Sequence, residues 1–126
     1  MAKKMLHTCV RVKDLEKSVT FYKDSLGMKE VRRLDYPDFK FTLVYLALEG
    51  DDYELELTYN YAQEVPYELG DGYGHIAVGV DDLESSRDEL AKKGYEVTDI
   101  KGLQDNAANY FFLFDPDGYK IEIIQN

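Results

Sequence analysis

Alternation of polar and apolar positions predicts that the chain opens with a β-strand followed by a helix. Residues 7–12 are rich in β-forming types, and their alternation divides them between two strand faces: His7, Cys9 and Arg11 on one, Thr8, Val10 and Val12 on the other. Asp14 stands in the position of a helix N-cap, and Gly27 is placed to end the helix. Apolar residues recur at helical spacing between them, which predicts a helix over about residues 15–26.

Three more strands are predicted in the first half of the chain. They lie at Val31 to Leu34, Phe39 to Leu48 and Tyr53 to Tyr59, and residues 49–52 form the turn between the last two. The order is therefore strand, helix and three strands, or βαβββ. Residues 60–73 hold a proline and turn-forming glycines without sustained periodicity, which predicts a connection.

The second half repeats this order. A strand from His75 to Val80 precedes a helix over about residues 83–93, which Gly94 closes. Strands are predicted near Glu96 to Ile100, Tyr110 to Phe114 and Tyr119 to Ile124. Residues 115–118, Asp-Pro-Asp-Gly, predict a hairpin turn, with the proline pre-set at its second position.

An internal repeat supports this duplication. Residues 75–86 match residues 7–18 without a gap, with seven identities: His7/His75, Val10/Val78, Val12/Val80, Asp14/Asp82, Leu15/Leu83, Glu16/Glu84 and Ser18/Ser86. A second repeat relates residues 53–57 to residues 119–123. We therefore expect an α+β fold of two tandem βαβββ modules, at about residues 5–60 and 73–126, within a single domain of residues 1–126.

Composition restricts the class of protein. The apolar fraction of 44% is typical of a globular chain, and no apolar run reaches the length of a membrane span. The residues before His7 lack the apolar core of a signal peptide, and the single cysteine, Cys9, permits no intrachain disulfide, so we expect a cytoplasmic protein. The net charge of −10 argues against non-specific binding to nucleic acid.

Polar residues on two predicted strands suggest a metal site. On the strand from residue 53, alternation separates two sets of side chains: Glu54, Glu56, Thr58 and Asn60 on one face, Leu55, Leu57 and Tyr59 on the other. If the polar face lines a cavity with the first strand, then four residues converge there: His7, Arg11, Glu56 and Asn60. His75 and Glu122 occupy the matching places in the second module.

Two imidazoles and two carboxylates are a ligand set for a divalent ion. Such a set suits Ni(II), Co(II), Zn(II), Mn(II) or Fe(II), with positions left for water or substrate, and does not choose among them. A single strand histidine is more often a structural residue. Here, however, both histidines of the chain fall at equivalent positions with a glutamate in each repeat, which favours ligation of a metal.

Five segments carry a family resemblance over nearly the whole chain. They are Leu6-His7-Thr8 with Arg11-Val12, Phe21-Tyr22 with Leu26-Gly27-Met28, residues 56–60 (Glu-Leu-Thr-Tyr-Asn), residues 73–77 (Tyr-Gly-His-Ile-Ala) and residues 115–122. Together they resemble glyoxalase I, or lactoylglutathione lyase, of the vicinal-oxygen-chelate superfamily. The resemblance implies a homodimer with its cavity built across the subunits. His7 and Glu56 of one subunit would meet His75 and Glu122 of the other at an interfacial metal site.

The resemblance also implies a reaction. The substrate would be the hemithioacetal of methylglyoxal and a thiol, normally glutathione, and the product the S-D-lactoyl thioester. Moving a proton from C1 to C2 passes through an enediolate, whose negative charge a Lewis acid stabilises. A carboxylate acts as the base that carries the proton between the two carbons. By the same analogy Glu122 would be the base, with Glu56 the alternative, and Arg11 and Asn60 would hold the glutathione moiety. The short chain resembles members that prefer Ni²⁺ or Co²⁺ more than those that prefer Zn²⁺.

Two departures from the family pattern leave the thiol open. Many members carry a lysine-glycine loop where this chain has residues 103–109 (Leu-Gln-Asp-Asn-Ala-Ala-Asn), so a cationic contact to the thiol is missing or comes from Lys101 or Lys120. Asp71 stands where some members have a basic residue.

The same scaffold serves other functions. An acyl-CoA epimerase would use a similar metal site, although residues 56–60 favour the glyoxalase. An extradiol dioxygenase would need two histidines and one glutamate around Fe(II), leaving Glu56 unnecessary. A non-enzymatic small-molecule-binding protein would need no metal. Metal analysis and an assay with methylglyoxal and a thiol distinguish these classes.

Overall fold

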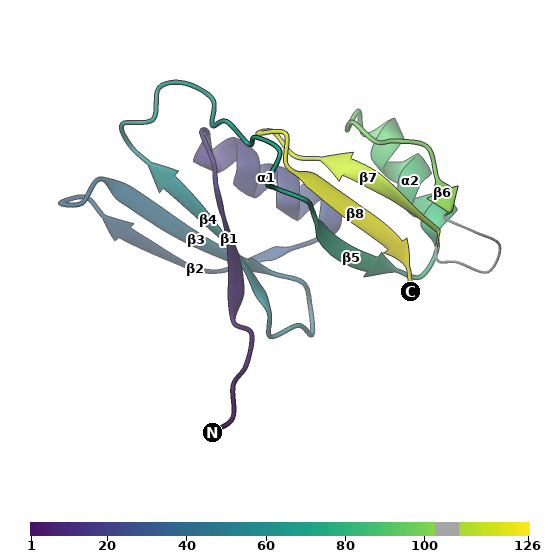
Figure 1. The fold of residues 1–126 in the computed structure, drawn as a ribbon, viewed down its shortest axis with the longest axis horizontal. Coiled ribbons are helices and arrows are strands. Elements are labelled where there is room, and N and C mark those ends of the chain that lie inside the picture. Colours follow the sequence, from purple (N-terminus) through teal and green to yellow (C-terminus); the bar gives the residue numbers. More distant parts are fainter. Residues whose placement is uncertain (103–108) are drawn as a thin grey trace. The chain divides into compact units, whose positions relative to one another are not determined.

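A computed structural model describes residues 1–102 and 109–126 and shows two compact units, Met1–Glu68 and Leu69–Asn126 (Figure 1). Each unit contains one helix and a four-stranded mixed sheet. The order of elements in both is βαβββ. The α+β fold class with its repeated βαβββ order, predicted from the sequence, is confirmed.

The first unit carries its polar residues on the sheet face opposite its core. Its elements are β1 (His7–Arg11), α1 (Leu15–Leu26), β2 (Lys29–Tyr36), β3 (Phe41–Ala47) and β4 (Glu54–Asn60), in the sheet order β1-β4-β3-β2. Strand β1 runs parallel to β4, and the other pairs are antiparallel. The inner face contributes Val10, Val44, Leu46, Leu55 and Leu57, which are buried with the apolar face of α1. His7, Tyr45 and Glu56 alternate with these residues and therefore belong to the other face.

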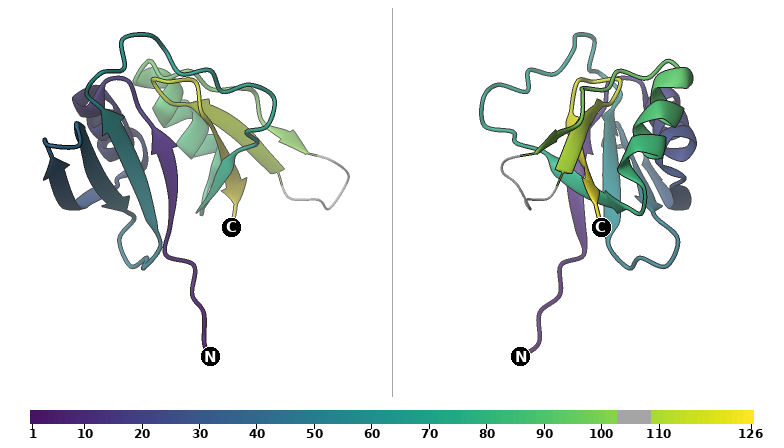
Figure 2. Two further views of the ribbon diagram at one scale, coloured as in Figure 1. Left: turned by 60° about the vertical axis from the view of Figure 1, so that its left-hand side comes forward. Right: turned by 90° about the vertical axis from the view of Figure 1, so that its right-hand side faces the viewer.

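The second unit has the same plan. Its elements are β5 (Ile76–Val80), α2 (Leu83–Lys92), β6 (Lys101–Gly102), β7 (Asn109–Phe114) and β8 (Lys120–Gln125), in the sheet order β5-β8-β7-β6 (Figures 1 and 2). Its apolar core includes Leu83 and Leu90 of α2 and, on the sheet, Phe111, Leu113, Ile121 and Ile123. Phe112 and Glu122 alternate with these residues and belong to the opposite face.

The elements with strong local signals lie where the sequence predicts them. Helix α1 covers Leu15–Leu26, and Gly27 ends it with φ of 73°, in the left-handed region that favours glycine. In the 115–118 turn the Gly118 amide donates to the Asp115 carbonyl at 3.0 Å. The buried Asp115 carboxylate also accepts from the amides of Asp117 and Tyr119, each at 2.9 Å, which braces the hairpin.

The prediction of a strand near Glu96 to Ile100 is wrong. That segment forms only an isolated bridge at Val97, and the strand at this place, β6, is the pair Lys101–Gly102. The Phe112 amide donates to the Thr98 hydroxyl at 2.9 Å instead of to a backbone carbonyl. The Thr98 carbonyl instead accepts from the Arg87 guanidinium at 2.8 Å. A side chain thus replaces a rung of the ladder and interrupts the strand.

Smaller differences concern strand ends. The edge strand β2 covers Lys29–Tyr36 rather than Val31 to Leu34. Its charged residues are exposed and join the sheet through backbone hydrogen bonds to β3, so the sequence has no apolar alternation that would mark them as strand. His75 lies one residue before β5 rather than within it. Helix α2 ends at Lys92, one residue before the predicted end. Within the described residues, no helix is long and apolar enough to cross a membrane.

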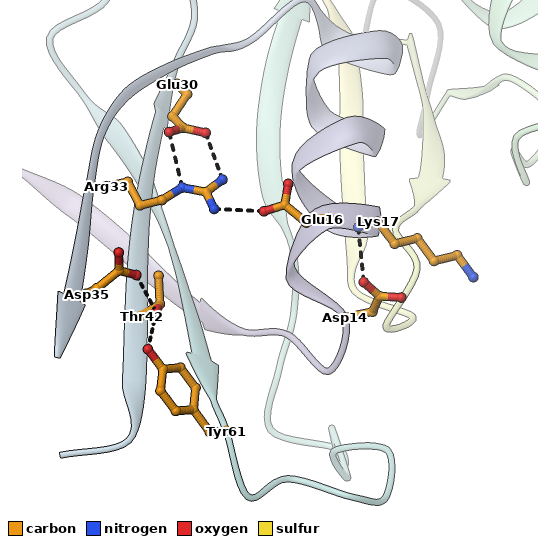
Figure 3. A network of polar contacts seen from close by, with 8 residues as sticks. All are labelled: Asp14, Glu16, Lys17, Glu30, Arg33, Asp35, Thr42 and Tyr61. Atoms are coloured by element: carbon orange, nitrogen blue, oxygen red, sulfur yellow. Dashed lines mark hydrogen bonds and ion pairs between the residues drawn. The ribbon is translucent and has the colours of Figure 1, made fainter. Parts of the chain in front are cut away.

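Polar contacts fix helix α1 at its start and against the sheet edge (Figure 3). The Asp14 carboxylate accepts from the Lys17 amide at 3.2 Å and so caps the helix. Arg33 on β2 donates to Glu30 at 3.2 and 3.0 Å and to Glu16 of α1 at 2.7 Å. These bonds connect the edge strand to the helix that covers the sheet.

We expect Asp14→Ala to lower the free energy of unfolding by about 1 kcal/mol, the usual cost of losing a side-chain N-cap. Urea denaturation followed by circular dichroism measures this loss. Asp51→Ala, which removes an exposed carboxylate from the turn between β3 and β4, is the matched control and should change stability little. Equal losses in the two variants would show that the cap contributes nothing specific.

Candidate functional site

The first unit brings His7 and Glu56 together on the polar face of its sheet. His7 opens β1, and the parallel register sets Glu56 of β4 directly opposite Cys9, two residues further along β1. The Nε2 atom of His7 lies 3.2 Å from Oε2 of Glu56. The imidazole is partly exposed, whereas only 11% of the Glu56 side chain is accessible to solvent. We call this the first His–Glu pair.

Three neighbouring side chains hold the Glu56 carboxylate. The Tyr45 hydroxyl donates to Oε2 at 2.6 Å, and the Thr58 hydroxyl donates to Oε1 at 3.0 Å. Burial acts to raise the pKa of Glu56, but the hydrogen bonds from Tyr45, Thr58 and Cys9, with the charge of His7, outweigh it and lower the pKa below its usual value. Glu56 is therefore an anchored carboxylate anion at neutral pH.

Tyr45 and Cys9, beside Glu56, stay protonated at neutral pH because the pKa of each is raised. Burial and the hydrogen bond to Glu56 raise the pKa of Tyr45 to about 12, which keeps its hydroxyl a donor. Cys9 is exposed, yet desolvation by neighbouring protein atoms raises the pKa of its thiol, which bonds Thr58 at 3.2 Å. A protonated thiol is a poor nucleophile, so the arrangement does not favour covalent chemistry at Cys9.

The second unit brings His75 and Glu122 together in the same way. The Nε2 atom of His75, just before β5, lies 3.4 Å from Oε1 of Glu122 on β8. The His75 ring lies 5.6 Å from the ring of Phe112. Within the described part of this unit, no hydroxyl, thiol or amide donates a hydrogen bond to Glu122. We call this the second His–Glu pair.

In both pairs the nitrogen and oxygen atoms lie at a separation at which they can form an ion pair or bind one metal ion together. Two ligand atoms about 2.1 Å from an ion, at about 90–110° to one another, lie about 3.0–3.4 Å apart. The observed nitrogen–oxygen distances are 3.2 and 3.4 Å. In residues 1–102 and 109–126, no three His, Cys, Asp or Glu residues gather in a metal-binding group. In the described residues, each unit therefore brings together two side chains of metal-ligand type, fewer than the three or four that a protein metal site uses.

The other predicted binding residues lie further along the same strands. Arg11 ends β1 opposite Thr58, and Asn60 ends β4. The Asn60 amide donates to the Tyr67 hydroxyl at 3.0 Å, which orients it. Arg11 and Asn60 share the strands and the sheet face of the first His–Glu pair.

Of the candidate cations for the thiol, Lys120 lies with its Nζ 5.1 Å from the centre of the Phe112 ring, and Lys101 is exposed on β6. Asp71 is exposed in the connection before β5. Residues 103–109 stand where many family members have a lysine-glycine loop, and of these, residues 103–108 lie outside the described part of the chain.

Sequence reasoning missed Tyr45 and Arg32. Tyr45 lies directly opposite Glu56 on β3, and the Arg32 guanidinium lies 3.8 Å above its ring while donating to Glu54 at 2.8 Å. The alternation of β3 places Tyr45 on one of two faces, but only the register between β3 and β4 identifies Glu56 as its neighbour.

Comparison with known proteins gives one family. The profile of the Glyoxalase/Bleomycin resistance protein/Dioxygenase superfamily matches residues 4–123. A lactoylglutathione lyase from Neisseria meningitidis is 46% identical over 125 residues, covering 97% of this chain and 90% of that protein.

Solved structures agree with that assignment. Glyoxalase I from Zea mays superimposes with a TM-score of 0.91 and 36% identity, covering 99% of this chain, which spans only 45% of the maize chain. Glyoxalase I from Leishmania major, described as trypanothione-dependent, gives a TM-score of 0.83 and 38% identity, covering 98% of this chain and 87% of that one.

Proposed function

The chain belongs to the Glyoxalase/Bleomycin resistance protein/Dioxygenase superfamily, and we propose that it is a lactoylglutathione lyase, a glyoxalase I. The enzyme isomerises the hemithioacetal of methylglyoxal and a thiol to the S-D-lactoyl thioester and so removes methylglyoxal. The observation that carries the proposal is the pair of His–Glu contacts, one in each unit, at metal-ligand separation. Full-length similarity to a lactoylglutathione lyase supports the same reaction.

The ligands of the metal are inferred to be His7, Glu56, His75 and Glu122, with one divalent ion per site. By analogy with the short-chain members of the family, which prefer nickel or cobalt, we favour one of these ions, with zinc as the alternative. When bound, the ion would act as a Lewis acid for the negative charge that develops on the substrate oxygens. Two imidazoles and two carboxylates satisfy such an ion and leave coordination positions for substrate.

The active enzyme is inferred to be a homodimer with its sites at the subunit interface. The first His–Glu pair of one subunit would combine there with the second pair of its partner. The supporting observation is that neither unit, within its described residues, supplies more than two ligands. Residues 1–126 would then act as one glyoxalase-like domain that contributes half of each of two sites.

The chain's own residues divide the work of the reaction. Glu122, which accepts no hydrogen bond from a hydroxyl, thiol or amide among the described residues of its unit, would take the proton from C1 of the hemithioacetal and return it to C2. Glu56, held by Tyr45 and Thr58, is the weaker candidate for that transfer. Arg11 and Asn60 would bind the thiol, the guanidinium taking a carboxylate and the oriented amide a peptide group.

The thiol is taken to be glutathione or a related small thiol. One solved relative is described as trypanothione-dependent, so relatives of this fold differ in the thiol they use. Because the protein carries a net charge of −10, it would need local cations such as Arg11 and Lys120 to bind an anionic thiol. The single cysteine accords with the reducing environment of the cytoplasm, where we place the enzyme.

The proposal is tested on purified protein that has been stripped of metal and reloaded with Ni²⁺, Co²⁺ or Zn²⁺. Each form is assayed with methylglyoxal and glutathione, trypanothione or coenzyme A, and the lactate released from the product is analysed for chirality. We expect no turnover without metal, and D-lactoyl thioester once an ion is restored. Bound metal without turnover of any hemithioacetal would refute a lyase function.

Subunit complementation tests the shared site. His7→Ala and His75→Ala should each bind metal at least tenfold more weakly than the wild type, because each loses one imidazole ligand. Refolded together, they should form heterodimers in which one site has all four wild-type ligands, and so recover activity. Each variant refolded alone is the control. Proven subunit exchange without recovered activity would indicate that each site lies within one chain.

Glutamine substitutions test the assignment of the base, because an amide oxygen can still ligate weakly but no longer accepts the proton. With metal bound, Glu122→Gln should lower kcat by roughly 10² to 10⁴, the usual contribution of a general base. Glu56→Gln should lower it less. Steady-state rates normalised to bound metal give the comparison, and the opposite ranking would exchange the two roles.

A further inference from the structure

The two repeat-related glutamates have different neighbours. Glu56 lies between Cys9 of β1 and Tyr45 of β3, directly opposite both in register. Glu122 lies between Ala77 of β5 and Phe112 of β7. The residue two positions after each glutamate, on the same strand face, is Thr58 in the first unit and Ile124 in the second. Three donor side chains thus surround Glu56, whereas the corresponding side chains around Glu122 have none.

Tyr45 donates to the carboxylate oxygen that faces the imidazole. Its hydroxyl lies 2.6 Å from Oε2 of Glu56, and the same oxygen lies 3.2 Å from Nε2 of His7. A carboxylate oxygen has two lone pairs, so this bond leaves one available on the side of His7. Thr58 occupies the other oxygen, Oε1, at 3.0 Å. Both oxygens are therefore oriented, and Oε2, the oxygen beside His7, keeps a second lone pair.

The Tyr45 hydroxyl is itself fixed by packing. The residue is 7% exposed, and its ring meets the His7 ring edge-on, with the ring centres 5.6 Å apart. The Arg32 guanidinium covers the ring at 3.8 Å and is tied to Glu54 at 2.8 Å. A donor held on several sides can position its acceptor with little loss of entropy on binding.

Glu122 has greater freedom. Among the described residues of its unit, the polar side chain beside it is that of His75, whose Nε2 lies 3.4 Å from Oε1, and 18% of the Glu122 side chain is exposed. Phe112 presents a ring in the place where Tyr45 presents a ring with a hydroxyl. A base must turn towards the carbon that loses the proton and must keep its basicity, and hydrogen-bond donors oppose both requirements.

We propose that Tyr45 is a positioning residue, whose hydroxyl holds Glu56 in the orientation of a permanent metal ligand. Of the two carboxylates, Glu122 is then the one available for proton transfer. This inference rests on the proposed function, because it assumes that His7 and Glu56 ligate an ion. Tyr45 differs from Phe112, at the equivalent place in the second unit, by the hydroxyl that donates this bond.

The test measures metal affinity in the absence of substrate, by competition with a chromophoric chelator, for Co²⁺ or Ni²⁺. Tyr45→Phe keeps the packed ring and removes only the hydroxyl, and it should raise the dissociation constant about 10- to 100-fold, the usual effect of losing a partner of a ligand. Tyr36→Phe, on the edge strand β2, is the matched control and should leave affinity unchanged. A dissociation constant for Tyr45→Phe within threefold of the wild type would overturn the proposal.

A double-mutant cycle shows whether Tyr45 acts through Glu56. In a Glu56→Gln background, Tyr45→Phe should change the dissociation constant by less than about threefold, because the group that it positions is already altered. The same loss in both backgrounds would show a structural role and overturn the proposal. If Tyr45→Phe does not fold, Thr58→Val removes the second donor and carries the same expectations.

The binding measurements separate this inference from the proposed function. A protein that binds metal but turns over no hemithioacetal would refute the lyase, while the effect of Tyr45→Phe on affinity would still decide whether the hydroxyl positions Glu56. An active lyase whose Tyr45→Phe variant binds metal normally would refute the inference alone.

Discussion

Parallel pairing of the first and last strands is the constraint on which each unit depends. Parallel neighbours need a long connection, and here the helix and two antiparallel strands form it. The pairing brings the start of one strand beside the middle of the other, so residues about fifty positions apart become neighbours. His7 meets Glu56 and His75 meets Glu122 for this reason. In each unit the helix lies on the apolar face of the sheet, and the His–Glu pair lies on the opposite face.

Much of this arrangement could be predicted because it depends on local signals. Asp14 and Gly27 define the ends of α1 through capping chemistry that operates over a few residues. The turn at residues 115–118 is fixed by a proline and by a glycine with φ of 92°. The His–Glu pairs were found differently, because the repeat shows the same two residue types at equivalent positions.

The remainder depends on register and on competition between bonds, which no local pattern encodes. Tyr45 is one of several aromatic residues in alternating strands, and only pairing with β4 makes it the neighbour of Glu56. Threonine is a residue type that favours strands, yet the Thr98 hydroxyl accepts the hydrogen bond from the Phe112 amide that a backbone carbonyl would accept in a continued ladder. Whether a hydroxyl or a carbonyl accepts that bond is settled by tertiary packing.

The strand pairings that the structure describes also bear on how such chains evolve. All of them join strands of the same unit, so neither sheet borrows a strand from the other. A gene that encodes one unit can therefore be duplicated, or two whole chains fused end to end, without breaking a sheet; the joining peptide needs only to be long enough. The maize glyoxalase I chain, of which this chain spans 45%, has the length expected of such a fusion. Self-contained sheets make gene fusion a small step for this fold.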